Sequence, residues 1–462
     1  MKKINEKEYA GKKICVIGSG KSGVAAAAFL KKLGGEPFLF DENDKITVED
    51  IRAKLPEELS DMEIVLKELP ESAVTATDLL VPSPGVPVDT PLVDRFREKN
   101  IPIYGEIEIA YRMDKGDVIA ITGTNGKTTT TTLVGDIMKA AGRKTFVVGN
   151  IGTPYTDKVM ESEETSVSVI EVSSFQLETI DAFHPVVSAV LNVTPDHLNR
   201  HHTMENYAQA KFDISKNQTK DDVCVLNADN EYTAEFAKRC PARVVLFSSH
   251  QILEEGIYLD GDTIYFAKNG SITELMNIHD MHLVGTCNVE NVCAAIAMTD
   301  AAGVPMDVIL DTVKNFRAVE HRIEYVDTVD GVEYYNDSKG TNPDAAIQGI
   351  RAMSRPTILI GGGYDKGNTY DEWIEEFGSK VKLLVLIGQT KEKIAECARS
   401  HGFDRIETAE TFEEAFRICV KKANSGDAVL LSPACASWGM FKDYEERGRI
   451  FKDMVRDLKK EQ

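Results

Sequence analysis

The sequence predicts an α/β fold in which parallel sheets are distributed over three domains. Short apolar strands alternate with periodic helices along the chain, which is typical of parallel sheets joined by crossover helices. Two strand-to-helix junctions are glycine-rich turns, at residues 18–23 and 122–128. The length of 462 residues is too great for one ordinary core and fits roughly three domains of about 150 residues each.

The composition restricts the compartment and the partners. The 74 acidic and 53 basic residues give a net charge of −21, which repels nucleic acids and anionic membranes at long range. No apolar run approaches the roughly 20 residues that span a bilayer, and the N-terminus lacks a signal-peptide pattern. The eight cysteines form no CxxC pair. We expect a cytoplasmic monomer with reduced thiols, no nucleic-acid partner and no membrane insertion.

The first predicted domain covers residues 1–105. An apolar strand at residues 14–17 leads through the turn at 18–23 into an alanine-rich helix, and a second strand ends at Asp41. The turn fits the G-x-G-x-x-G pattern of a Rossmann-like domain, with Asp41 near the position of a ribose-binding acid. The loop at residues 83–85 follows another apolar strand, where such sheets place ligand contacts. On these residues alone, NAD and a UDP-sugar both remain open.

The second glycine-rich turn lies near the start of the central predicted domain, residues 106–318. An apolar strand runs into Gly126-Lys127-Thr128 and then into a helix. Backbone amides and the helix N-terminus would surround phosphate oxygens, Lys127 would add a charge, and the Thr128 hydroxyl could hold Mg²⁺. Ile121 stands where the first glycine of the full pattern is expected, so the flanking strand and helix support the prediction. We predict an ATP-binding, P-loop ATPase-like domain with a parallel sheet.

Polar side chains follow three strands of this domain. Asn150 follows residues 146–148, Glu171 follows residues 167–170, and Asp196-His197 follows residues 189–193. Carboxylate and imidazole groups at the carboxyl ends of strands, beside a phosphate loop, are candidate metal or phosphate contacts. Each has an ordinary alternative as a capping or packed residue, but their occurrence around one loop favours a site.

Further polar and glycine-rich segments follow one another in order along the chain. The whole series is Thr122-Gly123-Thr124-Asn125-Gly126-Lys127-Thr128-Thr129 and residues 149–152, 171–178, 191–198, 288–291, 321–322, 336–342, 361–363 with Lys366, and 431–437. Together these segments resemble the Mur ligases of peptidoglycan synthesis, and the resemblance extends over essentially the whole chain. The final segment, with Phe441 and residues 446–448, is most similar to the members that add D-glutamate.

The resemblance implies ATP-dependent amide synthesis. The carboxylate of UDP-N-acetylmuramoyl-L-alanine would attack the γ-phosphate of ATP to give an acyl phosphate, and the amine of D-glutamate would then displace phosphate. It also implies two Mg²⁺ sites, one at Thr128 and Glu171 and one at His197 and a carbamylated Lys211. The helix sequence alone predicts a solvated Lys211, so that role comes only from the resemblance. The implied catalytic residues are Lys127, Asn150, Glu171, His197 and Lys211.

The resemblance also distributes the ligands over the three domains. The first domain would bind UDP, so no hydride acceptor is needed. The third, residues 319–462, has apolar strands at 357–360, 383–387 and 428–431 and would be a Rossmann-like α/β domain for D-glutamate. The implied ATP-binding residues are Gly123, Thr124, Asn125, Gly126, Lys127, Thr128, Thr129, Thr130, Asn288, Asn291, Arg322 and Asp337. The implied UDP-binding residues are Gly18, Ser19, Gly20, Lys21, Ser22, Asp41, Ser83, Pro84 and Gly85, and the D-glutamate-binding residues are Lys339, Thr341, Lys366, Ser437 and Phe441.

Two residues depart from the family pattern, and several alternatives share part of it. Cys287 stands where a histidine is usual, and Trp438 replaces a smaller apolar residue. Sister ligases that add L-alanine, a diamino acid or a dipeptide, and folylpolyglutamate synthases, would share the central domain. The chain lacks the Asp-Asn-Pro-Arg type motif associated with diamino-acid addition. Other classes are a non-catalytic nucleotide-binding regulator, opposed by the intact catalytic residues, and an NAD-dependent oxidoreductase fused to a P-loop module.

Overall fold

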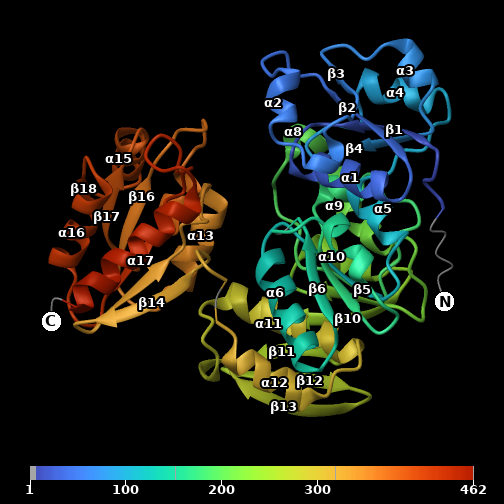
Figure 1. The fold of residues 1–462 in the computed structure, drawn as a ribbon. Coiled ribbons are helices and arrows are strands. Elements are labelled where there is room, and N and C mark those ends of the chain that lie inside the picture. The colour runs from blue at the N-terminus through green and yellow to red at the C-terminus, as the bar shows by residue number, and fades with distance from the viewer. Residues whose placement is uncertain (1–6, 151, 318, 461–462) are drawn as a thin grey trace. The chain divides into compact units, whose positions relative to one another are not determined.

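The computed structural model describes residues 7–150, 152–317 and 319–460; the predicted domain boundary at residue 318 lies outside them. The chain forms two compact units. The first unit contains residues 1–276 and 292–312, and the second contains residues 277–291 and 313–462. Figure 1 shows three separate sheets along the chain. None of the helices in the described part is long and apolar enough to cross a membrane.

The N-terminal sheet of the first unit is parallel, in the order β3-β2-β1-β4. Its sequence order reverses at β1, because β2 lies on one side of β1 and β4 on the other. In open α/β sheets, ligands bind at such a switch point, beyond the carboxyl ends of the strands. The strands are β1 (Lys13–Ile17), β2 (Glu36–Asp41), β3 (Ile64–Leu66) and β4 (Leu79–Pro82); the helices are α1 (Lys21–Lys32), α2 (Val48–Arg52), α3 (Glu71–Thr75) and α4 (Pro91–Arg97).

A larger sheet in the same unit has the order β13-β12-β11-β10-β9-β8-β5-β7-β6. The run from β6 to β11 is parallel, and β12 pairs with β11 in the antiparallel sense. The strands are β5 (Asp117–Thr122), β6 (Thr145–Gly149), β7 (Val167–Glu171), β8 (Val187–Val190), β9 (Val223–Asn227), β10 (Arg243–Ser248), β11 (Gly256–Asp260), β12 (Thr263–Lys268) and β13 (Ser271–Asn277). The helices are α5 (Glu106–Tyr111), α6 (Lys127–Ala140), α7 (Ser174–Leu177), α8 (Leu198–His201), α9 (Met204–Phe212) and α10 (Glu231–Ala237).

The prediction that a strand extends to Val193 is wrong, because β8 ends at Val190. Side chains replace the strand partner beyond that point. The Asn227 amide donates to the Leu191 carbonyl at 3.1 Å, and the Asn230 amide donates to the Val193 carbonyl at 3.0 Å. The chain can therefore leave the sheet with its backbone groups satisfied.

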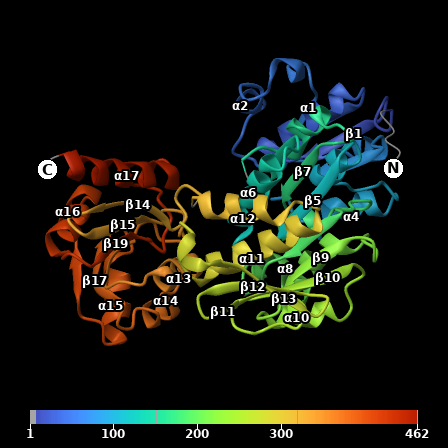
Figure 2. The same cartoon turned by 90° about the horizontal axis from the view of Figure 1, so that it is seen from below.

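The second unit contains a six-stranded sheet in the order β14-β15-β19-β16-β17-β18, parallel except for the β14–β15 pair. Its apolar side chains form one cluster around Trp373 and another around Phe416 and Phe451. In Figure 2, α17 lies over one face of this sheet, and α14 and α15 lie over the other. The strands are β14 (Glu324–Val329), β15 (Val332–Asn336), β16 (Thr357–Gly362), β17 (Val381–Ile387), β18 (Ile406–Thr408) and β19 (Ala428–Leu431). The helices are α13 (Pro343–Ala352), α14 (Asp371–Glu375), α15 (Lys391–Ser400), α16 (Phe412–Lys422) and α17 (Tyr444–Lys460).

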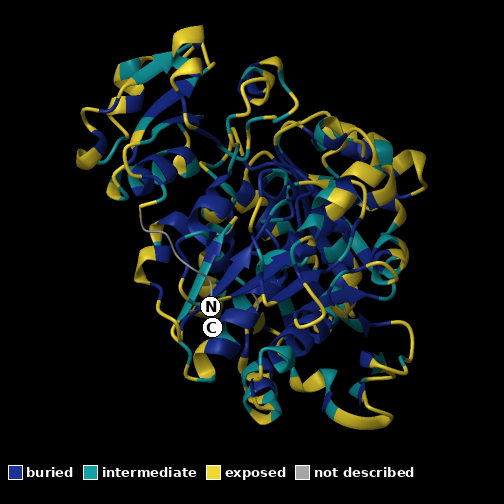
Figure 3. Ribbon diagram, turned by 90° about the vertical axis from the view of Figure 1, so that its right-hand side faces the viewer, coloured by how far each residue is buried: buried dark blue, intermediate teal, exposed yellow. Residues whose placement is uncertain are grey.

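Two further helices, α11 (Thr286–Ala301) and α12 (Met306–Asn315), lie between the large sheet and the last sheet in sequence. Figure 3 shows that the strands are mostly buried, whereas exposed residues concentrate on loops and outer helix faces. The α/β class with parallel sheets is therefore confirmed.

Candidate active site

In the turn between β5 and α6, the Lys127 side chain bonds to backbone carbonyls of the turn itself. Gly126 has φ +84° at the helix N-cap, a left-handed conformation that favours glycine. The ammonium of Lys127 donates to the carbonyls of Gly123 at 2.8 Å and Thr124 at 2.9 Å. Asn192 holds the turn from the end of β8: it accepts from the Asn125 amide at 2.8 Å and donates to the Asn125 carbonyl at 3.2 Å. The turn is thus fixed from two sides.

A buried carboxylate lies beside this turn. Glu171 ends β7, which pairs with β5, and it is only 3% exposed. The Thr128 hydroxyl donates to its Oε2 at 2.8 Å, and the Asn150 amide donates to its Oε1 at 2.8 Å. The structure therefore brings three of the predicted residues, Thr128, Asn150 and Glu171, into direct contact.

Lys211 lies under the same turn and is 2% exposed, in contrast to the solvated lysine that its helix sequence suggests. Its ammonium nitrogen donates to the Gly123 carbonyl at 2.8 Å and lies 4.4 Å from the centre of the Tyr207 ring. Burial, reinforced by the charge of Lys127, holds the pKa of Lys211 well below its usual value. Two lysine nitrogens thus converge on one carbonyl oxygen, and the neutral amine of Lys211 is favoured.

His197 follows the loop after β8 and precedes α8 in a left-handed conformation, with φ +53°. Its ring centre lies 4.8 Å from that of Phe175. Burial is the main reason that the pKa of His197 lies below its usual value; Asp196 opposes the shift, and Lys211 and Lys127 reinforce it. The neutral imidazole, the form that binds metals, is therefore favoured.

A cavity of about 470 Å³ opens at the switch point of the N-terminal sheet. Its lining includes all nine predicted UDP-binding residues, together with residues at the end of β6 such as Asn150 and Gly152. Asp41 accepts hydrogen bonds from the Ser19 amide at 2.9 Å and the Ser19 hydroxyl at 2.6 Å. Burial alone would raise the pKa of Asp41, but these bonds and one from the Asn43 amide lower it. A charged Asp41 therefore fixes the first glycine-rich turn.

The predicted nucleotide residues of the second unit form hydrogen bonds within that unit. Asn291 donates to the Asn288 side chain at 3.2 Å, and Asn288 donates to the Val284 carbonyl at 2.8 Å. Asp337 is buried and accepts from the Ser432 hydroxyl at 2.7 Å. Burial raises the pKa of Asp337 to about 7, while the nearby Arg322 charge opposes the shift.

The predicted D-glutamate residues lie against aromatic side chains or form hydrogen bonds with one another. The Lys366 nitrogen lies 4.8 Å from the centre of the Trp438 ring, and the Lys339 nitrogen lies 3.7 Å from that of Tyr444. A cavity of about 320 Å³ is lined by Trp438 and its neighbours but by none of the five predicted residues. Within the five, the Phe441 amide donates to the Ser437 carbonyl at 3.1 Å and the Thr341 amide to the Lys339 carbonyl at 2.8 Å.

Comparison with known proteins assigns the chain to a family. Three family models match consecutive parts: a Mur ligase MurD-like N-terminal domain at residues 12–105, a Mur ligase middle domain at 121–299, and a Mur ligase glutamate ligase domain at 321–435. A protein of Lachnospira eligens is 56% identical over 98% of this chain and all of its own length. One of Lachnoclostridium phytofermentans is 51% identical over 98% of this chain and all of its own length. Both are named UDP-N-acetylmuramoylalanine–D-glutamate ligase.

The chain belongs to the Mur ligase family. Solved Mur ligase structures share its fold at low identity. A MurF ligase of Thermotoga maritima in complex with ADP has a TM-score of 0.59 at 16% identity, with 99% of this chain and 98% of that chain covered. The MurC ligase of the same organism has a TM-score of 0.58 at 19% identity, with 96% and 99% covered. The predicted three-domain α/β class is thereby confirmed as the Mur ligase fold.

The sequence interpretation missed a buried cluster of this Mur ligase. His201 is buried, its Nε2 lies 3.0 Å from the Ser174 hydroxyl, and its pKa falls to about 4 through burial and the charge of Arg200. Arg200 donates to Glu178 at 2.6 Å and to the Val86 carbonyl at 3.0 Å, and so links the large sheet to the loop after β4. The i, i+4 spacing of His197 and His201 is the sequence feature that could have indicated this cluster.

Arg447 and Asn192 lie in segments that match the family, but neither residue was assigned a role from the sequence. Arg447 is buried and donates to the Ser338 carbonyl at 2.8 Å and to the Cys435 carbonyl at 3.3 Å. Burial lowers the pKa of Arg447 to about 10. It therefore ties together two of the segments that carry the family resemblance. Residues 446–448 contributed to the family resemblance, but the sequence of α17 does not show that Arg447 is buried.

Proposed function

We propose that this Mur ligase joins D-glutamate to UDP-N-acetylmuramoyl-L-alanine at the expense of ATP, giving ADP and phosphate, in cytoplasmic peptidoglycan precursor synthesis. The observation that carries the proposal is the full-length identity of 51–56% to relatives named for this activity. Residues 1–105 are assigned to UDP, 106–318 to ATP and 319–462 to the amino acid.

The turn after β5 would hold the phosphates of ATP. Its backbone amides open at the N-terminus of α6, and the Lys127 charge lies at the same place. The carboxylate of the first substrate and the γ-phosphate are both anions, so the first step needs this positive site. Holding the two reactants in line supplies up to about 7–11 kcal/mol of the barrier.

The residues beside the turn fit Mg²⁺. Thr128 and Glu171 offer a hydroxyl and a carboxylate oxygen 2.8 Å apart, and oxygen is the ligand that Mg²⁺ prefers. When bound, Mg²⁺ neutralises charge on the transferring phosphoryl group. Asn150 acts on the carboxylate rather than on substrate, because its amide hydrogen bond fixes the orientation of Glu171.

Lys211 fits the role of a carbamylated lysine. Carbon dioxide is attacked by a neutral amine, giving a carbamate with release of a proton, and a burial-lowered pKa favours that amine. The carbamate oxygens and the neutral imidazole of His197 would offer ligands for a second Mg²⁺. Tyr207 and the Gly123 carbonyl hold the nitrogen of Lys211 in place.

The cavity at the first glycine-rich turn is assigned to the uridine diphosphate. Gly20 is the N-cap of α1, whose first backbone amides can bind phosphate oxygens, and Lys21 adds a cation at the cavity wall. In the second unit, Lys339 and Lys366 are assigned to the two carboxylates of D-glutamate, and Thr341 and Ser437 to hydrogen bonds with it; a charge-assisted hydrogen bond contributes about 1.5–3 kcal/mol.

The experiment is a product analysis by mass spectrometry. The enzyme is incubated with ATP, MgCl₂ and UDP-N-acetylmuramoyl-L-alanine, and with D-glutamate, L-glutamate, L-alanine or meso-diaminopimelate as the amine. We expect product with D-glutamate and with none of the other three amines. Product with another amine would move the chain to a sister activity, and binding of ATP without any product would support the non-catalytic alternative.

A further inference from the structure

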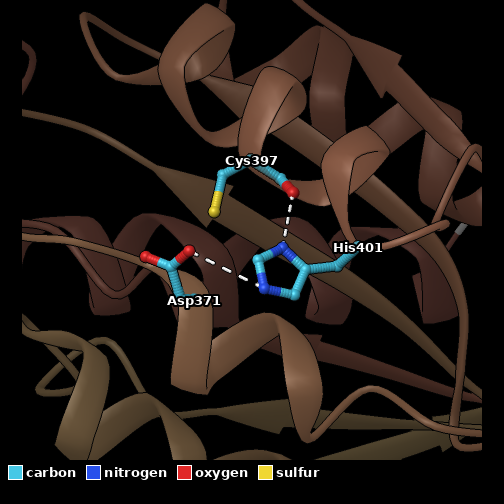
Figure 4. Close-up of side chains that lie close together, drawn as sticks. All are labelled: Asp371, Cys397 and His401. Atoms are coloured by element: carbon cyan, nitrogen blue, oxygen red, sulfur yellow. Dashed lines mark hydrogen bonds and ion pairs between the residues drawn. The ribbon is translucent and has the colours of Figure 1, made fainter.

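The second unit brings together a carboxylate, a thiol and an imidazole, none of which belongs to the predicted D-glutamate residues. Asp371 begins α14, Cys397 lies in the last turn of α15, and His401 caps that helix. One ligand atom of each side chain lies within 4.8 Å of the other two. Figure 4 shows the three side chains converging in the space between the two helices.

We propose that Asp371, Cys397 and His401 form a binding site for a thiophilic divalent cation of the Zn²⁺ class. Sulfur, imidazole nitrogen and carboxylate oxygen are the three donor types that Zn²⁺ takes in proteins. Mg²⁺ and Ca²⁺ favour oxygen ligands, so the thiol sulfur distinguishes this donor set from the oxygen and imidazole ligands assigned to Mg²⁺ in the first unit.

The distances suit a tetrahedral ion. Zn²⁺ ligands at about 2.0–2.3 Å from the metal lie roughly 3.3–3.8 Å from one another. The Nε2 atom of His401 lies 3.7 Å from Oδ1 of Asp371, and the remaining separations within the cluster are below 4.8 Å. Cys397 and His401 are four residues apart at the end of α15, so they project from the same side of the helix.

The histidine is held in a metal-binding tautomer. Nδ1 of His401 lies 2.9 Å from the Cys397 carbonyl oxygen, which can only accept, so Nδ1 is the donor. The lone pair of Nε2 is then directed towards the carboxylate and the thiol. Histidines that bind metals commonly donate the other ring N–H to a backbone carbonyl in this way.

A second carboxylate and partial exposure favour entry of an ion. Glu375, one turn along α14 from Asp371, has its Oε1 atom 3.8 Å from Nε2 of His401. The His401 side chain is 26% exposed, and Cys397 is partly buried. An ion bound here would connect α14, a helix of five residues, to α15. Since such a site requires both helices to be folded, the ion would stabilise the second unit.

The test uses the full chain, freed of metal, and its own fluorescence. Both tryptophans, Trp373 and Trp438, lie in the second unit, and Trp373 belongs to α14. We expect ZnCl₂ to bind at one equivalent by calorimetry and to raise the unfolding midpoint measured by tryptophan fluorescence, whereas MgCl₂ at the same concentration does not. CoCl₂ should give a thiolate-to-metal charge-transfer absorption.

The variants Cys397→Ser and His401→Gln should lose both the zinc-dependent shift and the cobalt absorption, and Asp371→Asn should weaken zinc binding at least about tenfold, the equivalent of roughly 1.4 kcal/mol. His282→Gln, a change at an exposed histidine outside the cluster, should bind as the unmodified chain does. Far-ultraviolet circular dichroism checks that each variant is folded. The proposal is overturned if the unmodified chain binds no zinc, or if folded Cys397→Ser binds it equally well.

Discussion

The turns after β1 and after β5 share one local plan, a strand, a glycine-rich turn and a helix, but they differ in what surrounds them. The turn after β5 carries Lys127 and Lys211 on its own carbonyls and is clamped by Asn192. The turn after β1 is fixed by one carboxylate, Asp41, and opens into a cavity of about 470 Å³.

A glycine-rich turn therefore predicts a phosphate-binding site, but it does not distinguish a uridine diphosphate from ATP. The side chains that distinguish the two turns come from the ends of neighbouring strands and from α9, far away in sequence. At the second turn, the Lys127 cation and the buried Lys211, which is proposed to become a carbamate that holds metal, suit the concentrated charge of phosphoryl transfer. At the first turn, the open cavity with Lys21 at its wall suits a substrate that is held but not attacked there.

The largest expected effect is at Lys127. Lys127→Ala should fold and lose activity by a factor of at least about 10², because a cation is removed where negative charge concentrates. Lys139 is an exposed lysine of the same helix and pairs with Asp136, so Lys139→Ala serves as the control and should remain active. Steady-state phosphate release measures both, and near-normal turnover of Lys127→Ala would remove the assignment of this turn to ATP.

Lys211→Ala should lose activity to a similar extent. Unlike Lys127→Ala, it should recover part of that activity with added acetate or propionate, because a free carboxylate can replace the carbamate oxygens. Exposed Lys238 offers the control substitution Lys238→Ala. Activity that is unaffected by Lys211→Ala would contradict the metal-binding role, and rescue of Lys127→Ala by the same acids would show that rescue is unspecific.

A smaller effect is expected at the first turn. Asp41→Ala removes the acceptor of both Ser19 hydrogen bonds and should raise KM for the uridine nucleotide about tenfold, since a charge-assisted hydrogen bond contributes about 1.5–3 kcal/mol. The KM for ATP should stay unchanged. Initial rates at varied concentrations of each substrate separate the two values, and a matching rise in both would argue against separate phosphate sites.

The smallest effect concerns stability and pH in the metal-free protein. The folded-state pKa of Lys211 is lowered, so the unfolded chain holds more protons at neutral pH and stability rises with pH towards the unfolded pKa of about 10.4. Lys211→Met should therefore unfold at a higher temperature at pH 7 and show a weaker increase with pH. Thermal unfolding by circular dichroism measures this; a lower midpoint together with an unchanged pH dependence would contradict the burial argument. The Gly123 carbonyl keeps its bond from Lys127 in this variant.

The sequence predicted the α/β class, both glycine-rich turns and the strand ends that bring Asn150 and Glu171 to Thr128, because these depend on local pattern and on strand order. It did not predict the burial of Lys211, since nothing within α9 shows that the helix lies under the turn after β5. The His201 and Arg200 cluster and the clamp by Asn192 were missed for the same reason: each depends on contacts between separate strand ends.

Calorimetry of each ligand against two variants shows whether the two turns bind different phosphates. UDP-N-acetylmuramoyl-L-alanine should bind Asp41→Ala at least about tenfold more weakly than the unmodified chain and Lys127→Ala within about twofold of it. ADP with Mg²⁺ should show the reverse pattern. If both variants lost affinity for both ligands to the same extent, the two turns would not be separate phosphate-binding sites.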